Sequence, residues 1–288
     1  MFTIKPLKQN NIAMLKNYKN GKESINSMNE DFLKLYEKCN FFEKFLLRKQ
    51  VRLLMYHNNL IGFIWCIYPE KNTCEIKSME IGDYDDLTSA YNHLLNSIST
   101  NKNITYYSVS NSISMEILEA LGFKKTEGTI EMFFDVNKMK DLEVPEAIKF
   151  QKLKRGKEEK IRCHMQNEVF ENKDRLPLSV EDIIFDEEQD YYLDDGAIFI
   201  KENNEYVGYG QIINDDETAM IVNFGIKKEF RGKGYGKCLI NYLVKLAKAF
   251  GYDKVFIKVD SCNKAAISLY EAMGFTLYKE CYKWELKK

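Results

Sequence analysis

Residues 230–239 read FRGKGYGKCL, a glycine-rich turn that leads directly into a helical pattern. A strand-like run, TAMIVNFGIKKEF at 218–230, precedes the turn. Glycines let the backbone approach a ligand closely, and the free N–H groups and dipole of a helix N-terminus attract anions. The segment therefore predicts an anion site where a strand meets a helix.

Two common nucleotide-binding loops do not fit this spacing. A Walker loop would need its first glycine at Arg231 and Ser or Thr at Cys238. The dinucleotide fingerprint G-x-G-x-x-G would need its third glycine at Lys237 or Leu239. The sequence therefore excludes a P-loop and a Rossmann fingerprint at this turn.

Strand-like and helical runs alternate through the second half of the chain, and their order, β-α-α-β-β-β-α-β-α-β, predicts a mixed α/β sheet. Ser179 and Asp182 have the spacing of a capping box. Gly251 and Gly274 stand where two helices should end. The predicted elements are strands at 148–154, 218–230, 254–260 and 275–286, a strand pair at 196–215 around an Asn-Asn turn, and helices at 157–170, 179–188, 235–250 and 263–273.

Two motifs in this half resemble those of the GNAT superfamily of N-acetyltransferases. The turn is similar to the acyl-CoA pyrophosphate signature of that family, and its three matching residues are Arg231, Gly234 and Gly236. The downstream helix pattern Asn-x-x-Ala-x-x-x-Tyr-x-x-x-Gly-Phe is matched by Asn263, Ala266, Tyr270, Gly274 and Phe275. The resemblance covers the chain from about Ile148 to Lys288.

The resemblance implies an acyl-CoA-dependent N-acetyltransferase with acetyl-CoA as co-substrate and a primary amine as acceptor. Acyl transfer needs a fixed pantetheine arm, a stabilised oxyanion and a protonated leaving thiolate. Tyr270 would be the general acid, with a core role as the alternative, and Asn263 would contact the cofactor arm, cap its helix or do both. The other implied cofactor-binding residues are Phe224, Gly225, Ile226, Arg231, Gly232, Lys233, Gly234, Tyr235 and Gly236, with Lys227, Lys228 and Lys237 adding charge nearby.

The first half of the chain repeats the order of the second half. FTIKPLK at 2–8 resembles IKFQKLK at 148–154, and VRLLMYHNNLIGFIWCIY at 51–68 again suggests two strands around an Asn-Asn turn. EALGF at 119–123 resembles EAMGF at 271–275, an offset of 152 residues that also places Asn111 on Asn263, Leu118 on Tyr270 and Gly82 on Gly234. We therefore predict two tandem GNAT-like domains, 1–143 and 144–288, each a mostly antiparallel central sheet flanked by helices.

The first copy is predicted to be degenerate. At the same offset, Met79 and Tyr84 stand in place of Arg231 and Gly236, and Leu118 cannot donate a proton. The carboxylates of Asp83, Asp85 and Asp86 would repel a pyrophosphate from the following helix. The expected role of this half is structural, or the shaping of the acceptor site. A catalytically silent acyl-CoA sensor or interaction module is the alternative for the whole protein.

The acceptor is expected to be a cationic amine, and one acidic stretch suggests why. In the resembled fold the segment 181–195 lies beside the acceptor, so an acidic rim there would concentrate an ammonium group. A solvated acidic face is the alternative. A carboxylate of this stretch, or Glu168 or Glu171, is the candidate base acting through water. The acidic residues of the stretch are Glu181, Asp182, Asp186, Glu187, Glu188, Asp190, Asp194 and Asp195.

The composition argues against several other partners. There are 42 Lys and Arg against 43 Asp and Glu, a formal net charge of -1, so we expect no nucleic-acid or membrane partner. The 7 cysteines include no C-x-x-C pair and the 3 histidines are scattered, so we expect neither a disulfide framework nor a metal site. The N-terminus lacks the apolar core of a signal peptide, which suggests a cytoplasmic protein, and the oligomeric state stays open.

Overall fold

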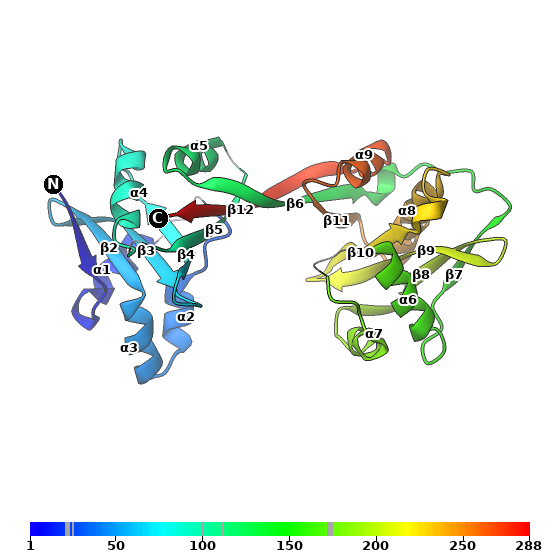
Figure 1. Cartoon of the computed structure of the whole chain (residues 1–288), viewed down its shortest axis with the longest axis horizontal. Coiled ribbons are helices and arrows are strands. Elements are labelled where there is room, and N and C mark those ends of the chain that lie inside the picture. The colour runs from blue at the N-terminus through cyan, green and yellow to red at the C-terminus, as the bar shows by residue number, and fades with distance from the viewer. Residues whose placement is uncertain (21–23, 25, 100, 111, 172–174) are drawn as a thin grey trace. The chain divides into compact units, whose positions relative to one another are not determined.

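A computed structural model describes residues 1–20, 24, 26–99, 101–110, 112–171 and 175–288 (Figure 1). The chain divides into two compact units, Met1–Thr129 with Lys279–Lys288, and Ile130–Tyr278. Two long strands, β6 (Lys124–Asp135) and β12 (Thr276–Lys287), contribute residues to both units. Each half of the chain thus supplies strand residues to the other half's unit. The predicted boundary between residues 143 and 144 stays a prediction, because compactness alone does not assign functional domains.

The first unit contains a mixed sheet with helices packed against it. The strand order is β1, β2, β3, β4, β5 and then the end of β12. Neighbouring strands are antiparallel except β4 and β5, which run parallel. The elements are β1 (Phe2–Pro6), α1 (Ile12–Lys19), α2 (Phe32–Lys38), α3 (Phe41–Lys49), β2 (Val51–Tyr56), β3 (Asn59–Ile67), β4 (Thr73–Ile81), α4 (Leu87–Leu95), β5 (Asn103–Val109) and α5 (Ser112–Ala120).

Alternate residues of one strand explain how this sheet is buried on both faces. Leu53 and Met55 on β2 pack with Leu15 of α1, whereas Leu54 between them packs with Leu94 of α4. Successive side chains of a strand point to opposite faces. The continuous apolar run of β2 therefore marks a strand covered by helices on both sides.

The second unit has the same arrangement. The strand order is β6, β11, β10, β9, β8 and β7, and only β10 and β11 form a parallel pair among the described pairings of this unit. The elements are β7 (Ile148–Lys152), α6 (Glu159–Val169), α7 (Val180–Glu187), β8 (Tyr192–Glu202), β9 (Glu205–Asp215), β10 (Thr218–Ile226), α8 (Tyr235–Ala249), β11 (Lys254–Asp260) and α9 (Lys264–Ala272).

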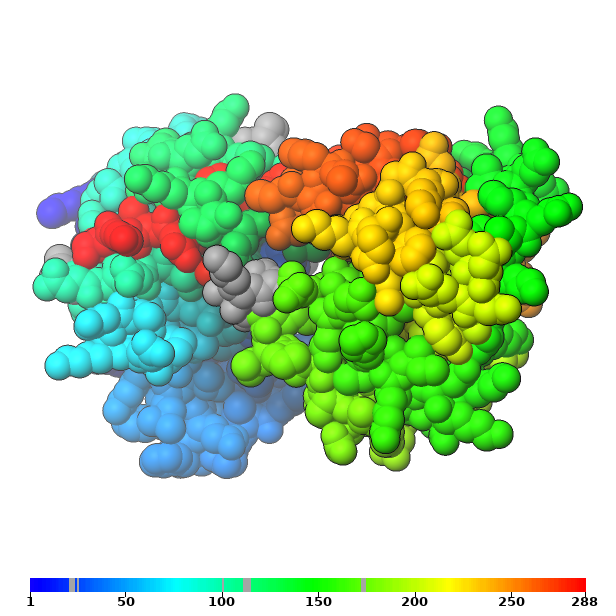
Figure 2. All heavy atoms as spheres, turned by 45° about the vertical axis from the view of Figure 1, so that its right-hand side comes forward, coloured from blue at the N-terminus to red at the C-terminus, as the bar shows by residue number. Residues whose placement is uncertain are grey.

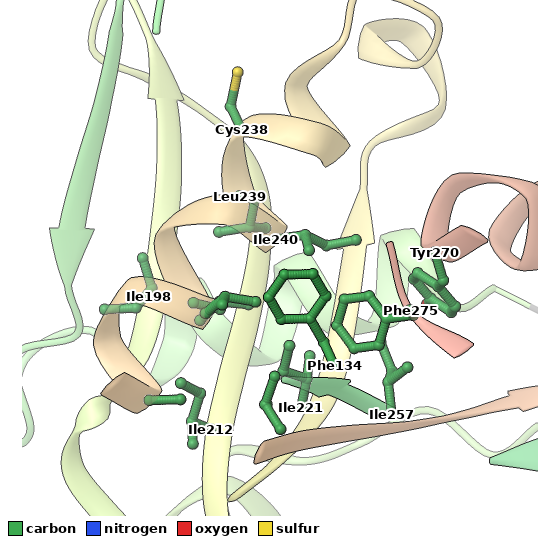
Figure 3. Close-up of a cluster of buried hydrophobic side chains, with 14 of the residues drawn as sticks. Phe134, Ile198, Ile212, Ile221, Cys238, Leu239, Ile240, Ile257, Tyr270 and Phe275 are labelled. Carbon is green, nitrogen blue, oxygen red and sulfur yellow. The ribbon is translucent and has the colours of Figure 1, made fainter. Parts of the chain in front are cut away.

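The core of the second unit lies between the sheet and α8. Leu239 and Ile240 of α8 pack with Ile221 and Ile257 of the two parallel strands, and Tyr270 lies at the edge of the same cluster (Figure 3). A smaller cluster on the other face joins Phe199 and Tyr209 of the sheet to Met165 of α6. These two layers hold the end of β10 and the start of α8 in place, and the glycine turn lies between them.

The structure confirms the predicted mixed α/β class and the element order of the second half. The Ser179 hydroxyl accepts from the Asp182 N–H at 3.2 Å, as a capping box requires. Asn203 and Asn204, with φ values of 47° and 71°, form the predicted tight turn. In the first half the prediction is one residue late, because His57 and Asn58, not an Asn-Asn pair, have the positive φ values.

The predicted offset of 152 residues holds for only part of the repeat. It relates α5 to α9 and β6 to β12, but β4 and β10 begin at Thr73 and Thr218, and α4 and α8 at Leu87 and Tyr235. Gly82 directly follows β4, whereas Gly234 directly precedes α8, so the predicted equivalence of these two glycines is wrong. The connection 227–234 is longer than 82–86, and the register of the two halves changes across it. Asn111, predicted to match Asn263, lies outside the described residues.

Candidate active site

The two central parallel strands of the second unit separate before they end. The residues that pair are Ala219–Ile221 of β10 with Val255–Ile257 of β11. Beyond this point β10 continues to Ile226 and β11 to Asp260, and neither bonds to the other within the described chain. The backbone edge of β10 that faces this gap is therefore open to a ligand.

A bulge in β10 accompanies the separation. The register of β10 against β9 shifts between Val222 and Gly225, and Asn223 has a φ of 52°. A Cβ atom on Gly225 would lie 2.1 Å from the Val169 side chain, so α6 packs directly against the bulge. Bulges bend a strand and leave residues unpaired. The predicted strand residues Phe224, Gly225 and Ile226 lie in this segment.

The glycine turn exposes a row of backbone donors at the start of α8. Gly232 and Gly234 have φ values of 80° and 85°, a conformation that favours glycine, and a Cβ on either would meet nothing within 4 Å. The N–H groups of 232–236 donate to no acceptor in the described protein. Gly236 packs against α9, where an added Cβ would lie 3.1 Å from Leu269, and Figure 2 shows both segments at the surface. The predicted anion site therefore has the required backbone geometry.

Charged side chains around the turn divide into paired and unpaired groups. The Arg231 guanidinium donates through Nε to the Ile226 carbonyl at 2.9 Å and through Nη2 to the Val169 carbonyl at 3.4 Å, so it fastens the turn to β10 and α6. The Tyr235 hydroxyl donates to Glu202, which raises the pKa of Tyr235 to about 12. Lys227 pairs with Glu168 at 3.1 Å and Lys233 lies 3.6 Å from Glu202, whereas Lys228 and Lys237 form no ion pair with any described residue.

Tyr270 is a core residue whose hydroxyl has no described hydrogen bond. Its ring lies 6.0 Å from the ring of Phe224 on β10 and 6.0 Å from that of Phe275. Burial raises the pKa of the Tyr270 phenol well above its ordinary value, so the hydroxyl keeps its proton at neutral pH. Both predicted roles fit this environment, because the ring fills the core while the hydroxyl can still donate.

Asn263 caps α9 as one of its two predicted roles requires. Its Oδ1 accepts from the Ala266 N–H at 3.1 Å. The Nδ2 group donates to no described residue, so a contact with the cofactor arm stays a prediction.

A pocket of about 490 Å³ lies at the C-terminal end of α6. The Phe170 ring in its wall would lie 3.7 Å from a Cβ on Gly225, which places the pocket next to the bulge. Glu168 is held by Lys227, while Glu171 is exposed and forms no described ion pair. The lining residues are His164, Asn167, Glu168, Phe170, Glu171, Arg175 and Pro177.

A chain of buried polar residues that the sequence does not indicate lies beneath the bulge. Arg162 on α6 is 1% exposed, and its Nη2 donates to Gln211 Oε1 at 2.9 Å. The same oxygen accepts from Asn223 Nδ2 at 3.3 Å, so Gln211 connects the buried arginine to the bulge residue. No motif marks these residues, because they come from three separate elements.

Most carboxylates of the acidic stretch 181–195 are already bonded within the protein, and its role beside the acceptor stays a prediction. Arg162 pairs with Asp186 and, at 3.3 Å, with Glu187. Arg155 pairs with Asp194 at 2.7 Å and Lys152 with Asp195 at 2.8 Å, while Asp182 caps α7. Of the eight acidic residues, Glu181, Glu188 and Asp190 have neither a described ion pair nor a described side-chain hydrogen bond.

Comparison with known proteins agrees with this geometry. Residues 163–275 match the Acetyltransferase (GNAT) family, a segment that includes the bulge, the glycine turn and Tyr270. This part of the chain is similar to the GNAT acetyltransferases. The predicted recognition and the predicted enzyme class are therefore confirmed for this part of the chain.

The relatives in sequence are acetyltransferases that match only part of the chain. The mycothiol acetyltransferase of Corynebacterium glutamicum is 30% identical over 89 residues, which cover 31% of this chain and 30% of that protein. The [ribosomal protein bS18]-alanine N-acetyltransferase of Salmonella typhimurium is 31% identical over 65 residues, 23% of this chain and 43% of that protein. The matched segments thus span less than half the length of these relatives.

Two solved structures share the fold over nearly the whole chain. A GCN5-related N-acetyltransferase from Sphaerobacter thermophilus has a TM-score of 0.63 at 15% identity, covering 99% of this chain and 95% of its own. A tandem GNAT protein from the clavulanic acid biosynthesis pathway has a TM-score of 0.51 at 11% identity, covering 100% and 98%. The predicted GNAT fold is confirmed.

Two features of the described residues bear on other partners. No helix among them has the length and apolar character needed to cross a membrane. No group of three or more His, Cys, Asp or Glu side chains among them could hold a metal ion.

Proposed function

We propose that this protein is an N-acetyltransferase that moves an acetyl group from acetyl-CoA to a primary amine, with the second unit as the catalytic part. The observation that carries the proposal is the separation of β10 from β11 directly before a turn with free N–H groups. A pantetheine arm and a pyrophosphate need backbone partners of these two kinds. The GNAT match over 163–275 supports the same assignment.

The residues of the site divide the chemistry among them, with acetyl-CoA supplying the thioester. The edge of β10 at 224–226 would hold the pantetheine arm and donate to the thioester oxygen as charge develops on it. The N–H groups of 232–236 would bind the pyrophosphate, with Lys228 and Lys237 adding positive charge. Tyr270 would donate its retained proton to the leaving sulfur as the C–S bond breaks and the C–N bond forms.

We place the amine acceptor in the pocket at the end of α6. The last carbonyls of a helix carry partial negative charge, which favours an ammonium group there. Glu171 adds a carboxylate with no described ion pair, and it is our candidate for the base that deprotonates the amine through water. This pocket therefore favours a cationic acceptor. We prefer it to the stretch 181–195, because ion pairs with Lys152, Arg155 and Arg162 largely neutralise that stretch.

The test is release of free thiol from acetyl-CoA by the purified chain across a panel of primary amines and matched alcohols. We expect thiol release with cationic amines and none with alcohols. Glu171→Gln should raise the acceptor KM, whereas Glu188→Gln, an exposed carboxylate of the acidic stretch, should leave it unchanged. Binding of acetyl-CoA without thiol release for any amine would instead support the silent sensor.

A further inference from the structure

In the first unit, β4 and β5 separate in the same way as β10 and β11. They pair in parallel from Thr73 with Asn103 to Ile76 with Tyr106. Beyond this point β4 continues to Ile81 and β5 to Val109. The first unit therefore has a gap between parallel strands at the position where the second unit is open.

A segment of the chain's own backbone crosses this gap. The residues Asn26–Glu30 belong to the connection between α1 and α2. On the β4 side, Glu30 N–H donates to the Lys77 carbonyl at 2.9 Å, and Asn29 Nδ2 donates to the Met79 carbonyl at 3.2 Å. The segment thus satisfies two carbonyls of the edge that β5 has left.

On the β5 side of the gap, the buried side chain of Asn26 bonds to the strand edge. Asn26, 4% exposed, donates through Nδ2 to the Tyr107 carbonyl at 2.7 Å and accepts at Oδ1 from the Val109 N–H at 3.1 Å. One amide therefore binds a C=O and an N–H group of the same strand edge, as a neighbouring strand would.

Tyr106 fixes the two asparagines relative to each other. Its hydroxyl accepts from Asn26 Nδ2 at 2.8 Å and donates to Asn29 Oδ1 at 2.8 Å. Because the segment is bonded to both strands and to this buried phenol, it is an ordered part of the first unit's fold and not a loop lying over it.

The matching connection in the second unit is held elsewhere. Asn167 on α6 accepts from the Leu178 N–H at 2.8 Å and donates to the Leu178 carbonyl at 2.9 Å. No described residue of 170–179 bonds to β10 or β11. The same asparagine chemistry therefore ties the connection to the strands in one unit and to the helix in the other.

We propose that Asn26–Glu30 is an internal ligand that occupies, in the first unit, the position of the pantetheine arm. This rests on the proposed function of the second unit, in which the gap between β10 and β11 would hold the pantetheine arm. The first unit then takes no acyl-CoA, and the chain has one acetyl-CoA site. Asp86 closes the remaining anion position, because its carboxylate accepts from the Ser89 N–H at the start of α4.

Hydrogen exchange of the full chain, with and without acetyl-CoA, tests the proposal. Acetyl-CoA should slow exchange at 222–236 and leave 77–81 and 107–109 unchanged, with one acetyl-CoA bound per chain by titration calorimetry. In the apo protein, Asn26→Ala should speed exchange of the Val109 N–H by about tenfold or more, since its acceptor is removed. Asn92→Ala, on the exposed face of α4, is the matched control and should not change it.

Slowed exchange at 107–109 on addition of acetyl-CoA, or two acetyl-CoA per chain, would overturn the proposal. So would equal Val109 exchange in Asn26→Ala and Asn92→Ala. If Asn26→Ala does not fold, the two wild-type measurements decide. If acetyl-CoA protects no segment at all, the proposed function fails, whereas the Val109 measurement still reports on the internal contacts.

Discussion

The gap between β10 and β11 and the gap between β4 and β5 are two versions of one structural feature with opposite contents. In the second unit, residues 222–226 of β10 form no described bond with β11, and they lead into a glycine turn whose N–H groups donate to no described acceptor. In the first unit the chain itself bonds to both strands through Asn26 and Glu30. A shared sheet therefore does not imply a shared site, because a connection between two helices decides whether the gap can accept a ligand.

The starts of α8 and α4 differ in the same sense. Gly234 precedes α8 in a left-handed conformation and offers no side chain, whereas the Asp86 carboxylate caps α4. The Asp86 carboxylate occupies the Ser89 N–H and places a negative charge at the start of α4, which disfavours an outside anion there. The two units thus differ at each position that an acyl-CoA would use.

The largest expected effect follows from giving the second unit the kind of helix start found in the first. Gly234→Asp should weaken acetyl-CoA binding by about 100-fold or more, because a carboxylate about 4 Å from a phosphate costs several kcal/mol at an effective dielectric constant of about 20. Gly251→Asp is the matched control, since Gly251 has a φ of 90° and equally open space at the other end of α8. Calorimetry of both variants decides, and equal affinities would show that the turn does not bind the pyrophosphate.

The next effect concerns the only titratable hydroxyl proposed to act in the chemistry. Tyr270→Phe should lower kcat by roughly 10- to 1000-fold while acetyl-CoA affinity stays nearly constant, because the ring remains and only the donor is lost. Steady-state kinetics under conditions where the chemical step limits the rate provide the measurement. An unchanged kcat would leave Tyr270 with a core role alone.

Local signals made much of the second unit predictable from sequence. Glycines with positive φ at 251 and 274 end their helices, and the Ser179 capping box begins another, as the residue types require. The glycine turn was equally visible, because a glycine-rich run before a helix is a local pattern. The start and end of α8 were therefore predicted correctly.

Contacts between distant segments could not be predicted in this way. The exchange of strand residues through β6 and β12, the bonds of Asn26 to β5 and the link from Arg162 to the bulge all join elements far apart in sequence. The error at Gly82 arises because the connection 227–234 and helix α8 are both longer than their counterparts in the first half, which changes the offset along the chain. The ion pairs of the acidic stretch 181–195 could not be predicted either, because their partners Arg155 and Arg162 lie outside it.

A smaller effect tests whether the open gap depends on its bulge. Asn223→Gly keeps the positive φ but removes the donor to Gln211, so the bulge loses its anchor to Arg162. We expect the KM for acetyl-CoA to rise about fivefold, since a neutral buried hydrogen bond contributes about 1 kcal/mol. Asn203→Gly is the control, a change of the same kind at a φ of 47° in a hairpin turn of the same sheet. If both variants have the wild-type KM, the polar chain does not position the site.

The smallest effect compares two buried phenols, one beside each gap. Tyr106 donates to Asn29 and accepts from Asn26, whereas the Tyr270 hydroxyl has no described partner. At neutral pH, Tyr106→Phe should lower the free energy of unfolding by about 1 kcal/mol, because Asn26 Nδ2 and Asn29 Oδ1 each lose one hydrogen-bond partner, and Tyr270→Phe should lower it by less. Burial raises the pKa of both phenols, so each folded state retains its proton while the unfolded chain ionises above pH 10. Between pH 10 and 12 the wild type should therefore lose stability relative to either variant by up to about 1.4 kcal/mol per pH unit. Denaturant unfolding at pH 7 measures the stability lost with each hydroxyl, and unfolding at pH 11 measures the pH-dependent loss. Equal losses of stability in the two variants at pH 7 would contradict the role assigned to Tyr106 in holding Asn26–Glu30.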